Sequence, residues 1–169
     1  MSKGVVAFAF GVPSTILSNQ NIAWIAWRKA RELGALVFTQ RDVDVNANFQ
    51  ICSVDVDHVR EESDNPPPTL RIAREAVRWA KQRGVTELYV VAAEPHLRRC
   101  VRDLMEADRE LNGVYTLPII FCGEISRVSD NDWFCSESTQ ERTRSRKAWN
   151  RRERILRMMP FWLYKRVAS

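Results

Sequence analysis

The chain has 169 residues and a net charge of +5, with 45% hydrophobic and 28% charged residues. These values are ordinary for a single globular domain with a substantial core. No stretch approaches the roughly 18 consecutive apolar residues of a membrane span, and the N-terminus has too short an apolar run for a signal peptide, so we expect neither.

The cysteines and the charge distribution limit the cellular compartment and the binding partners that the protein can have. Four cysteines form no CxxC pair and no zinc spacing. Cys100 and Cys122 lie in apolar patterns, so we expect buried free thiols and a cytoplasmic protein. Residues 139–169 carry ten basic and two acidic side chains, a net +8, which leaves −3 for the rest. The basic charge therefore belongs to a tail, and the domain itself gives no firm nucleic-acid signal.

A first buried strand is expected at 4–10, followed by a turn at Gly11, Pro13 and Ser14. In a doubly wound sheet this turn lies at the carboxyl edge, where ligands bind. The turn has one glycine, so it is not a GxGxxG fingerprint and does not specify a dinucleotide.

The next segment predicts a helix and a second strand. The helix should start with Ser18 or Asn19 as its N-cap and end at Gly34, before a short strand at 35–39. Together with the first strand this makes a βαβ unit.

Between 40 and 57 the pattern is weaker. Phe49 and Ile51, with Val54 and Val56 as further candidates, alternate with polar residues, which indicates a half-exposed strand near an edge. The surrounding acidic residues could hold a metal or form a solvated loop, and we prefer the loop because no known ligand spacing matches. We expect no metal site. These acidic residues, with one histidine, are Asp42, Asp44, Asp55, Asp57 and His58.

A proline-rich connector, 61–69, leads into a helix predicted from Thr69 to Arg83 and capped by Gly84. Glu62 and Thr69 could approach the carboxyl edge from this connector. Thr69 is also a natural N-cap, and that role alone would explain it.

The segment 85–104 reads as strand, tight turn and helix, with the strand at 86–92 and Pro95 as the first helical residue. His96 and Arg99, three residues apart, then lie at a helix N-terminus that favours anions. We expect a neutral His96 that donates or accepts a proton, and Arg99 as a clamp on phosphate or carboxylate. The alternative is an exposed histidine beside a solvated basic face.

A last strand is predicted at 116–122, where Pro118 argues for an edge position. A polar loop should follow over 123–140. A basic helix from 144 to 159 then closes the chain, broken at Pro160 before several aromatic residues.

The alternation of strands and helices predicts an α/β fold, a three-layer α/β/α sandwich with a mostly parallel Rossmann-like sheet. We assign 1–140 to a ligand-binding domain and 141–169 to a basic helix and aromatic tail packed on the same domain. Three interpretations of the tail compete: docking on its own domain, which we prefer, pairing with a second copy as a homodimer, or contact with an anionic membrane surface.

Three short segments resemble the ElyC/SanA/YdcF family, the bacterial domain of unknown function 218. They are AFAFG near the start, VREESDNPPPTLRIA with Glu61, Glu62 and Thr69, and VVAAEPHLRRC with His96 and Arg99. The resemblance covers roughly 4 to 122. It implies a Rossmann-like fold and a small anionic or nucleotide-like ligand, but no settled reaction.

The chain also departs from that family. Arg71 and Ile72 stand where the family usually carries Glu-Asn, and Ala92 and Ala93 where it favours Thr-Ser. Several polar groups expected to line the pocket are therefore absent. Either the ligand differs or the site has degenerated.

Two function classes follow. The first is a hydrolase or transferase, or a binding protein, acting on a small anionic or nucleotide-like ligand; no cofactor is identified. The second is a non-catalytic binding module or membrane-surface adaptor that uses the basic C-terminus. For the first class, His96 is the candidate catalytic residue, and the candidate ligand-binding residues are Gly11, Ser14, Asn19, Glu62, Thr69 and Arg99.

Overall fold

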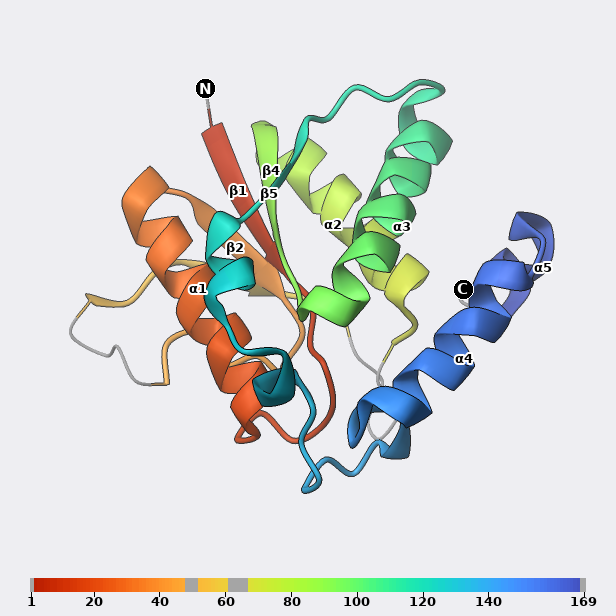
Figure 1. Ribbon diagram of the computed structural model, residues 1–169. Helices are drawn as coiled ribbons and strands as arrows, with labels where there is room; N and C mark the ends of the chain where they lie inside the picture. Colours follow the sequence, from red (N-terminus) through yellow and green to blue (C-terminus); the bar gives the residue numbers. More distant parts are fainter. Residues whose placement is uncertain (1, 48–51, 61–66, 168–169) are drawn as a thin grey trace.

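A computed structural model describes residues 2–47, 52–60 and 67–167 of the chain. The described strands form a single five-stranded sheet in the order β3-β2-β1-β4-β5, with every neighbouring pair parallel (Figure 1). The predicted α/β fold with a parallel Rossmann-like sheet is confirmed. The strands are β1 (Ser2–Ala7), β2 (Leu36–Thr39), β3 (Val56–His58), β4 (Val85–Val91) and β5 (Ile119–Phe121).

Helices cover both faces of this sheet (Figure 1). Helix α1 (Leu17–Leu33) lies on one face, and α2 (Thr69–Gln82) and α3 (Glu94–Asn112) lie on the other. Val5 belongs to the apolar cluster on the α1 side and Val6 to the cluster on the α2 and α3 side. Because successive side chains of a strand point to opposite faces, a strand covered on both sides must be apolar throughout.

Gly4 shows how closely α2 packs against β1. A Cβ at this position would lie 3.1 Å from the Trp79 ring and 3.0 Å from Val85. Glycine therefore lets the large indole of α2 approach the central strand without a clash.

The predicted strands are present, but their bounds differ. The first strand was expected at 4–10 and ends at Ala7. The Phe8 amide still donates to the Val91 carbonyl of β4 at 2.9 Å, but the two amides after it bond to side chains. The Ala9 amide donates to Gln40 Oε1 at 2.9 Å, and the Phe10 amide donates to Asn19 Oδ1 at 2.9 Å. The strands expected at 35–39, 86–92 and 116–122 are observed as β2, β4 and β5 within these or neighbouring residues. β5 is an edge strand that begins just after Pro118, as its proline predicts.

The predicted N-caps of α1 and α2 are wrong. α1 begins at Leu17 after Ile16, because the side chains of Ser18 and Asn19 bond to the preceding loop instead of capping the helix. Thr69 is the first residue of α2 and Pro68 precedes it, so Thr69 is not the cap. α2 ends at Gln82 with Arg83 as its C-cap, and Gly84 terminates it as predicted: its φ is +64° and its amide donates to the Lys81 carbonyl at 3.3 Å.

Two further predictions need correction. Helix α3 begins at Glu94, which makes Pro95 its second residue. The segment 123–140, predicted as a polar loop, contains the short 3-10 helices η2 (Gly123–Arg127) and η3 (Asp130–Trp133). Trp133 is fully buried there in the α1-side core, so this segment packs as part of the fold.

The chain closes with η4 (Glu141–Thr143), α4 (Arg146–Met158) and α5 (Phe161–Val167). Helix α4 was expected at 144–159; its first turn is capped by Ser145, which accepts from the Ala148 amide at 3.3 Å. The break at Pro160 separates α4 from α5, as predicted. Both helices lie on the α3 side of the molecule (Figure 1). Within the described ranges, none of the helices is long and apolar enough to cross a membrane.

The segment 146–167 contacts the sheet domain through one side of each helix. Leu156 and Tyr164 are buried against Leu70 of α2. The Tyr164 hydroxyl donates to the Asp103 carboxylate of α3, and Lys165 forms an ion pair with Glu110. Arg74 and Lys165 together lower the pKa of Glu110 to about 2. Apolar and charged contacts therefore both hold the segment to α2 and α3.

Candidate functional site

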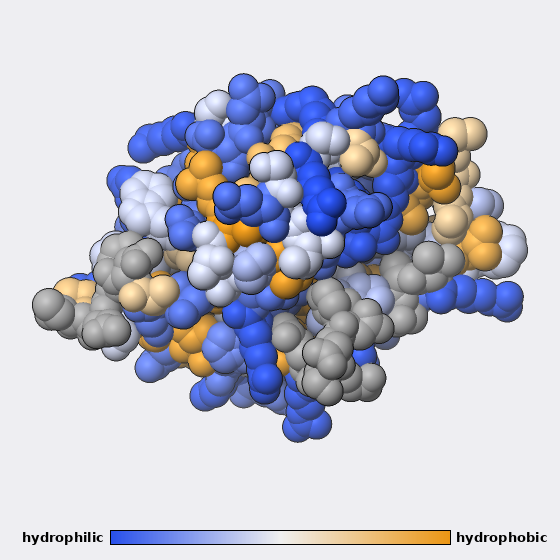
Figure 2. Space-filling view, turned by 90° about the horizontal axis from the view of Figure 1, so that it is seen from below, coloured by the Kyte–Doolittle hydropathy of each residue, from blue (hydrophilic) through white to orange (hydrophobic). Residues whose placement is uncertain are grey.

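A small cavity of about 50 Å³ lies at the carboxyl edge of the sheet. It lies among the loops that follow β1 and β2, the first turns of α2 and α3, and the segment from η4 to α4. Figure 2 looks onto this edge from below, where hydrophilic residues predominate. The residues of the cavity wall used below are Gly11, Gln40, Asp42, Thr69, His96, Arg99, Arg142 and Trp149.

Gly11 fixes the loop that follows β1. Its φ of +102° is unfavourable for residues with a side chain, and a Cβ there would lie 2.7 Å from Ser138 Oγ and 2.8 Å from Thr143 Oγ1. Buried Asn19 holds the same loop, because its Nδ2 donates to the carbonyls of Gly11 and Pro13, each at 3.0 Å. The loop is therefore packed tightly between α1 and the stretch that contains Ser138 and Thr143.

His96 is buried in the first turn of α3, with 5% of its surface exposed. Its ring packs against Phe8, Phe10 and Trp149. Burial, followed by the positive charges of Arg99, Arg142 and Arg152, holds the pKa of His96 well below its usual value. The imidazole is therefore neutral at pH 7.

The contact with Arg99 also determines which nitrogen of His96 carries the hydrogen. Arg99 Nη2 lies 3.2 Å from His96 Nδ1. A guanidinium can only donate, so Nδ1 accepts and the single ring hydrogen is on Nε2. His96 can therefore donate from Nε2 to a bound group, while its Nδ1 is occupied.

Arg99 is buried and makes contacts on three sides. Besides His96, its Nη1 forms an ion pair with Glu153 Oε2 of α4 at 3.0 Å, and its guanidinium carbon lies 5.0 Å from the Trp149 ring centre. Its Nε is buried and has no hydrogen-bond partner among the described residues. The clamp expected for an external anion is thus partly occupied by the protein's own carboxylate.

Arg142 of η4 adds a second guanidinium to the cavity wall. Burial and the nearby charges of Arg152 and Arg99 lower the pKa of Arg142 to about 10. It remains protonated at pH 7, and no carboxylate in the described ranges forms an ion pair with it. Burial and the charge of Arg99 likewise lower the pKa of Arg152. Three guanidiniums therefore repel one another around one neutral imidazole.

The structure brings four of the predicted site residues to this cavity: Gly11, Thr69, His96 and Arg99. Ser14 and Asn19 do not line it. The Asn19 amide is used by the loop backbone, which leaves it a scaffolding role. Glu62 lies outside the described residues.

Other residues on the wall were missed by sequence reasoning. Gln40 and Asp42 come directly after β2, so the rule that marked Gly11 and His96 after their strands could have found them. Arg142 and Trp149 come from the C-terminal segment, where no local pattern indicates that they reach the carboxyl edge. In the described residues, no group of three or more His, Cys, Asp or Glu side chains could hold a metal ion.

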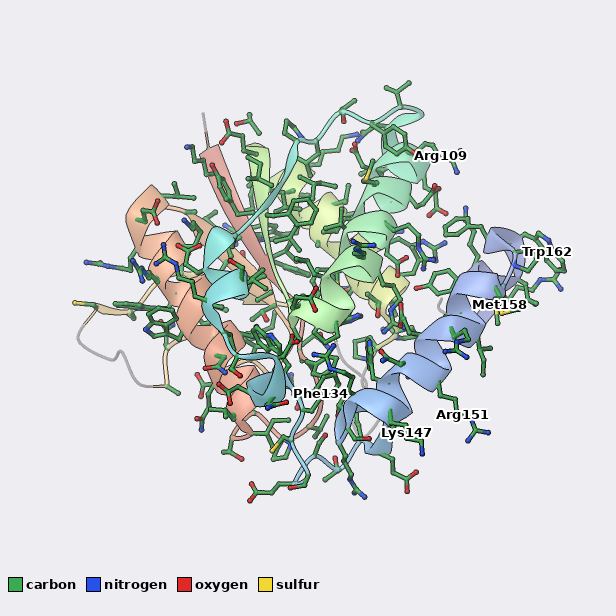
Figure 3. All side chains as sticks on the ribbon, viewed as in Figure 1. Arg109, Phe134, Lys147, Arg151, Met158 and Trp162 are labelled. Atoms are coloured by element: carbon green, nitrogen blue, oxygen red, sulfur yellow. The ribbon has the colours of Figure 1, made fainter. Side chains whose placement is uncertain are left out.

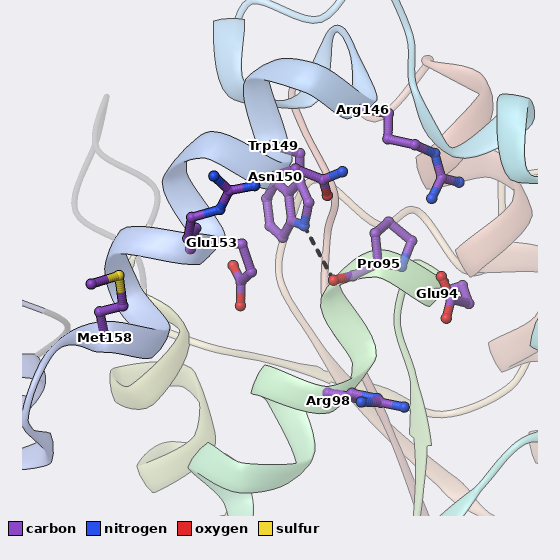
Figure 4. Close-up of a pocket in the computed structure, with 9 residues that line it drawn as sticks. Glu94, Pro95, Arg98, Arg146, Trp149, Asn150, Glu153 and Met158 are labelled. Carbon is purple, nitrogen blue, oxygen red and sulfur yellow. Dashed lines mark hydrogen bonds between the residues drawn. The ribbon is translucent and has the colours of Figure 1, made fainter.

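A second, larger groove of about 490 Å³ lies between the start of α3 and α4 (Figure 4). Its walls include Arg98 and Arg154 on opposite helices, and Glu153 at its inner side. Trp149 borders both spaces and its indole N–H donates to the Pro95 carbonyl at 3.2 Å. This tryptophan therefore stands between the groove and the small cavity.

The dimensions limit what the small cavity can hold. A volume of about 50 Å³ is far below the roughly 300–1,000 Å³ of a pocket for a whole small molecule. It provides room for a few water molecules, or for a single phosphoryl or carboxylate group. The cations Arg99 and Arg142 and the donor His96 line that space, together with one carboxylate, Asp42. Cations and donors are the groups that a phosphoryl or carboxylate group requires.

Compared with models of known families and with curated proteins, the chain shows no significant match. The resemblance to the ElyC/SanA/YdcF family therefore stays a prediction.

Proposed function

We propose that this protein binds a small ligand through a phosphoryl group in the cavity at the carboxyl edge of the sheet. The observation that carries the proposal is the excess of positive charge there, three guanidiniums near the cavity against the two carboxylates Asp42 and Glu153. Arg99, Arg142 and Arg152 act on the same buried His96. Among the described residues, Glu153 is the carboxylate in ion-pair contact with this group.

Electrostatics supports this interpretation. Guanidiniums removed from water are normally paired, because desolvation disfavours an isolated charge. An anion placed between Arg99 and Arg142 would reduce their mutual repulsion and would accept a hydrogen bond from His96 Nε2. A phosphoryl group suits this arrangement because guanidiniums bind its oxygens in a bidentate manner.

The rest of such a ligand would lie outside the cavity. A nucleotide-like ligand, which the family resemblance implies, would insert its terminal phosphate and leave the base and sugar towards solvent. Binding is the function that these groups support directly. Hydrolysis or transfer needs a proton acceptor as well, and Asp42 is the carboxylate among the described residues of the wall.

Calorimetric titration of the full chain with inorganic phosphate tests the proposal. We expect saturable binding that chloride at equal ionic strength does not reproduce. Arg142→Gln should weaken it at least tenfold, since losing one partner of a desolvated charge pair costs about 2 kcal/mol or more. The matched control is Arg127→Gln, which removes an exposed arginine of η2. Absence of binding, or equal losses in both variants, would overturn the proposal.

A further inference from the structure

The segment 146–167 has an outer face that the packing on α2 and α3 leaves uncovered. Met158 is 80% exposed, Trp162 63% and Ile155 58%. The helix α4 residues Lys147, Arg151 and Arg154 are exposed as well. We call these six residues the outer face. Arg154 and Met158 stand at the rim of this face, where they also border the groove beside α3. Figure 3 shows Lys147, Arg151, Met158 and Trp162 directed away from the rest of the molecule.

Helical spacing explains why these residues share one side. Lys147, Arg151, Arg154 and Met158 are separated by four, three and four residues, so they form one stripe along α4. Glu153 and Leu156 point to the opposite, buried side. The side of α4 that faces the protein therefore carries apolar side chains and an ion-paired glutamate. The side that faces solvent carries cations and large apolar side chains.

The charge on this face is of one sign. Residues 146–167 contain a single acid, Glu153, and it is buried against Arg99. The exposed Arg166 of α5 adds a further cation, with its guanidinium 5.8 Å from the Trp162 ring centre. The outer face therefore combines exposed cations with three apolar side chains, and no exposed carboxylate of residues 146–167 lies on it.

We propose that the outer face docks on the surface of an anionic phospholipid bilayer. Ile155, Met158 and Trp162 would enter the boundary between headgroups and acyl chains, and the cations would contact lipid phosphates. Amphipathic helices bind bilayers through these two contributions together. Tryptophan also favours this boundary, because its ring is apolar and its N–H is polar.

Other occupants fit the face less well. A second copy would bring the same cations against one another, which is repulsive. A nucleic-acid backbone would pair with the arginines but would leave Met158 and Ile155 without an apolar partner. The proposal does not rest on phosphate binding at the small cavity, which lies on the inner side of α4.

Flotation of the full chain with vesicles tests the proposal. We expect it to float with vesicles of phosphatidylcholine and phosphatidylglycerol and to remain unbound with phosphatidylcholine alone. Met158→Ser with Trp162→Ser should weaken binding at least tenfold. Arg151→Glu with Arg154→Glu should do the same, because each cation near the surface contributes on the order of a fivefold change in affinity.

A charge-matched control separates the face from the net charge. Arg31→Glu with Arg127→Glu removes the same charge from exposed positions on α1 and η2, and should change binding by less than about twofold. If the wild type does not float with anionic vesicles, or if the control loses as much binding as the face variant, the proposal is wrong. It is also wrong if the serine variant retains full binding to the vesicles. The cations alone would then account for binding, and an acidic protein or a nucleic acid would be the better candidate partner.

Discussion

The sheet domain and the segment 146–167 are stabilised by different interactions. In the domain, apolar side chains fill both faces of the sheet, with Val5, Val6 and Leu88 fully buried. The segment contributes a small apolar cluster around Leu156 and Tyr164 and inserts the Trp149 ring into the α1-side core beside Phe10. Its other contacts include ion pairs and hydrogen bonds to α3. Its attachment to the domain therefore depends on charge pairs next to the site as well as on apolar packing, whereas the interior of the sheet is apolar.

The largest effect should come from the core. Leu88→Ala should lower the free energy of unfolding by about 2–5 kcal/mol, because it removes a fully buried side chain and leaves a cavity. Urea denaturation measures this. Leu111→Ala, at an exposed position of α3, is the control and should change stability by under about 1 kcal/mol. Equal losses would contradict the assignment of the core.

Glu153→Gln should give the next largest effect. Losing the carboxylate leaves buried Arg99 without its ion-pair partner and should lower the unfolding free energy by about 2 kcal/mol in chloride buffer. Phosphate should then stabilise the variant more than it stabilises the wild type, since an anion can replace the lost charge. The midpoints of thermal unfolding of the wild type and the variant, each measured in chloride and in phosphate buffer, test this expectation. Equal phosphate stabilisation would show that Glu153 does not compete with the anion.

Tyr164→Phe tests the attachment of α5. Its hydroxyl donates to Asp103, a fully buried carboxylate that also accepts from Arg102. Removing this bond should cost about 1–2 kcal/mol, because one acceptor of Asp103 loses its partner while the Arg102 contact remains. Urea denaturation measures the loss. Phe161→Leu is a useful comparison, since it changes a half-buried ring of the same helix without removing a hydrogen bond to the core.

The smallest effect is a pH dependence that arises from His96. Its pKa is lowered in the folded protein, so below the usual 6.5 the unfolded chain takes up a proton that the folded protein does not. Stability should therefore fall as the pH decreases below 6.5, by at most about 1.4 kcal/mol per pH unit until the folded pKa is reached. His96→Phe should remove this slope. His58→Phe, at an exposed position, should keep it.

Much of this fold follows from local patterns in the sequence. The segment 85–104 was predicted as strand, tight turn and helix, and the structure has β4 and α3 there. The parallel sheet then placed His96 at the carboxyl edge, because strand ends meet there. Local patterns failed where a polar side chain had a distant partner. Asn19 looks like a helix cap in sequence, but its amide is bonded to the loop after β1.

The candidate site was less predictable for the same reason. Arg142 reaches the cavity only because the chain after β5 returns beneath the sheet edge. The spacing of apolar residues in the sequence does not predict this course of the chain. Residue type also did not distinguish the two sides of α4. Ile155 and Leu156 are adjacent and equally apolar, yet one is exposed and the other buried.

The central claim is that an oxyanion binds between His96 and the arginines around it. The chain has two histidines, His96 in the site and His58 on β3, so their imidazole resonances can be followed separately by NMR while phosphate is added. We expect the His96 resonances to shift and saturate in phosphate but not in chloride, while those of His58 stay constant. If the His96 resonances do not respond, or both histidines shift alike without saturation, the cavity is not an anion site.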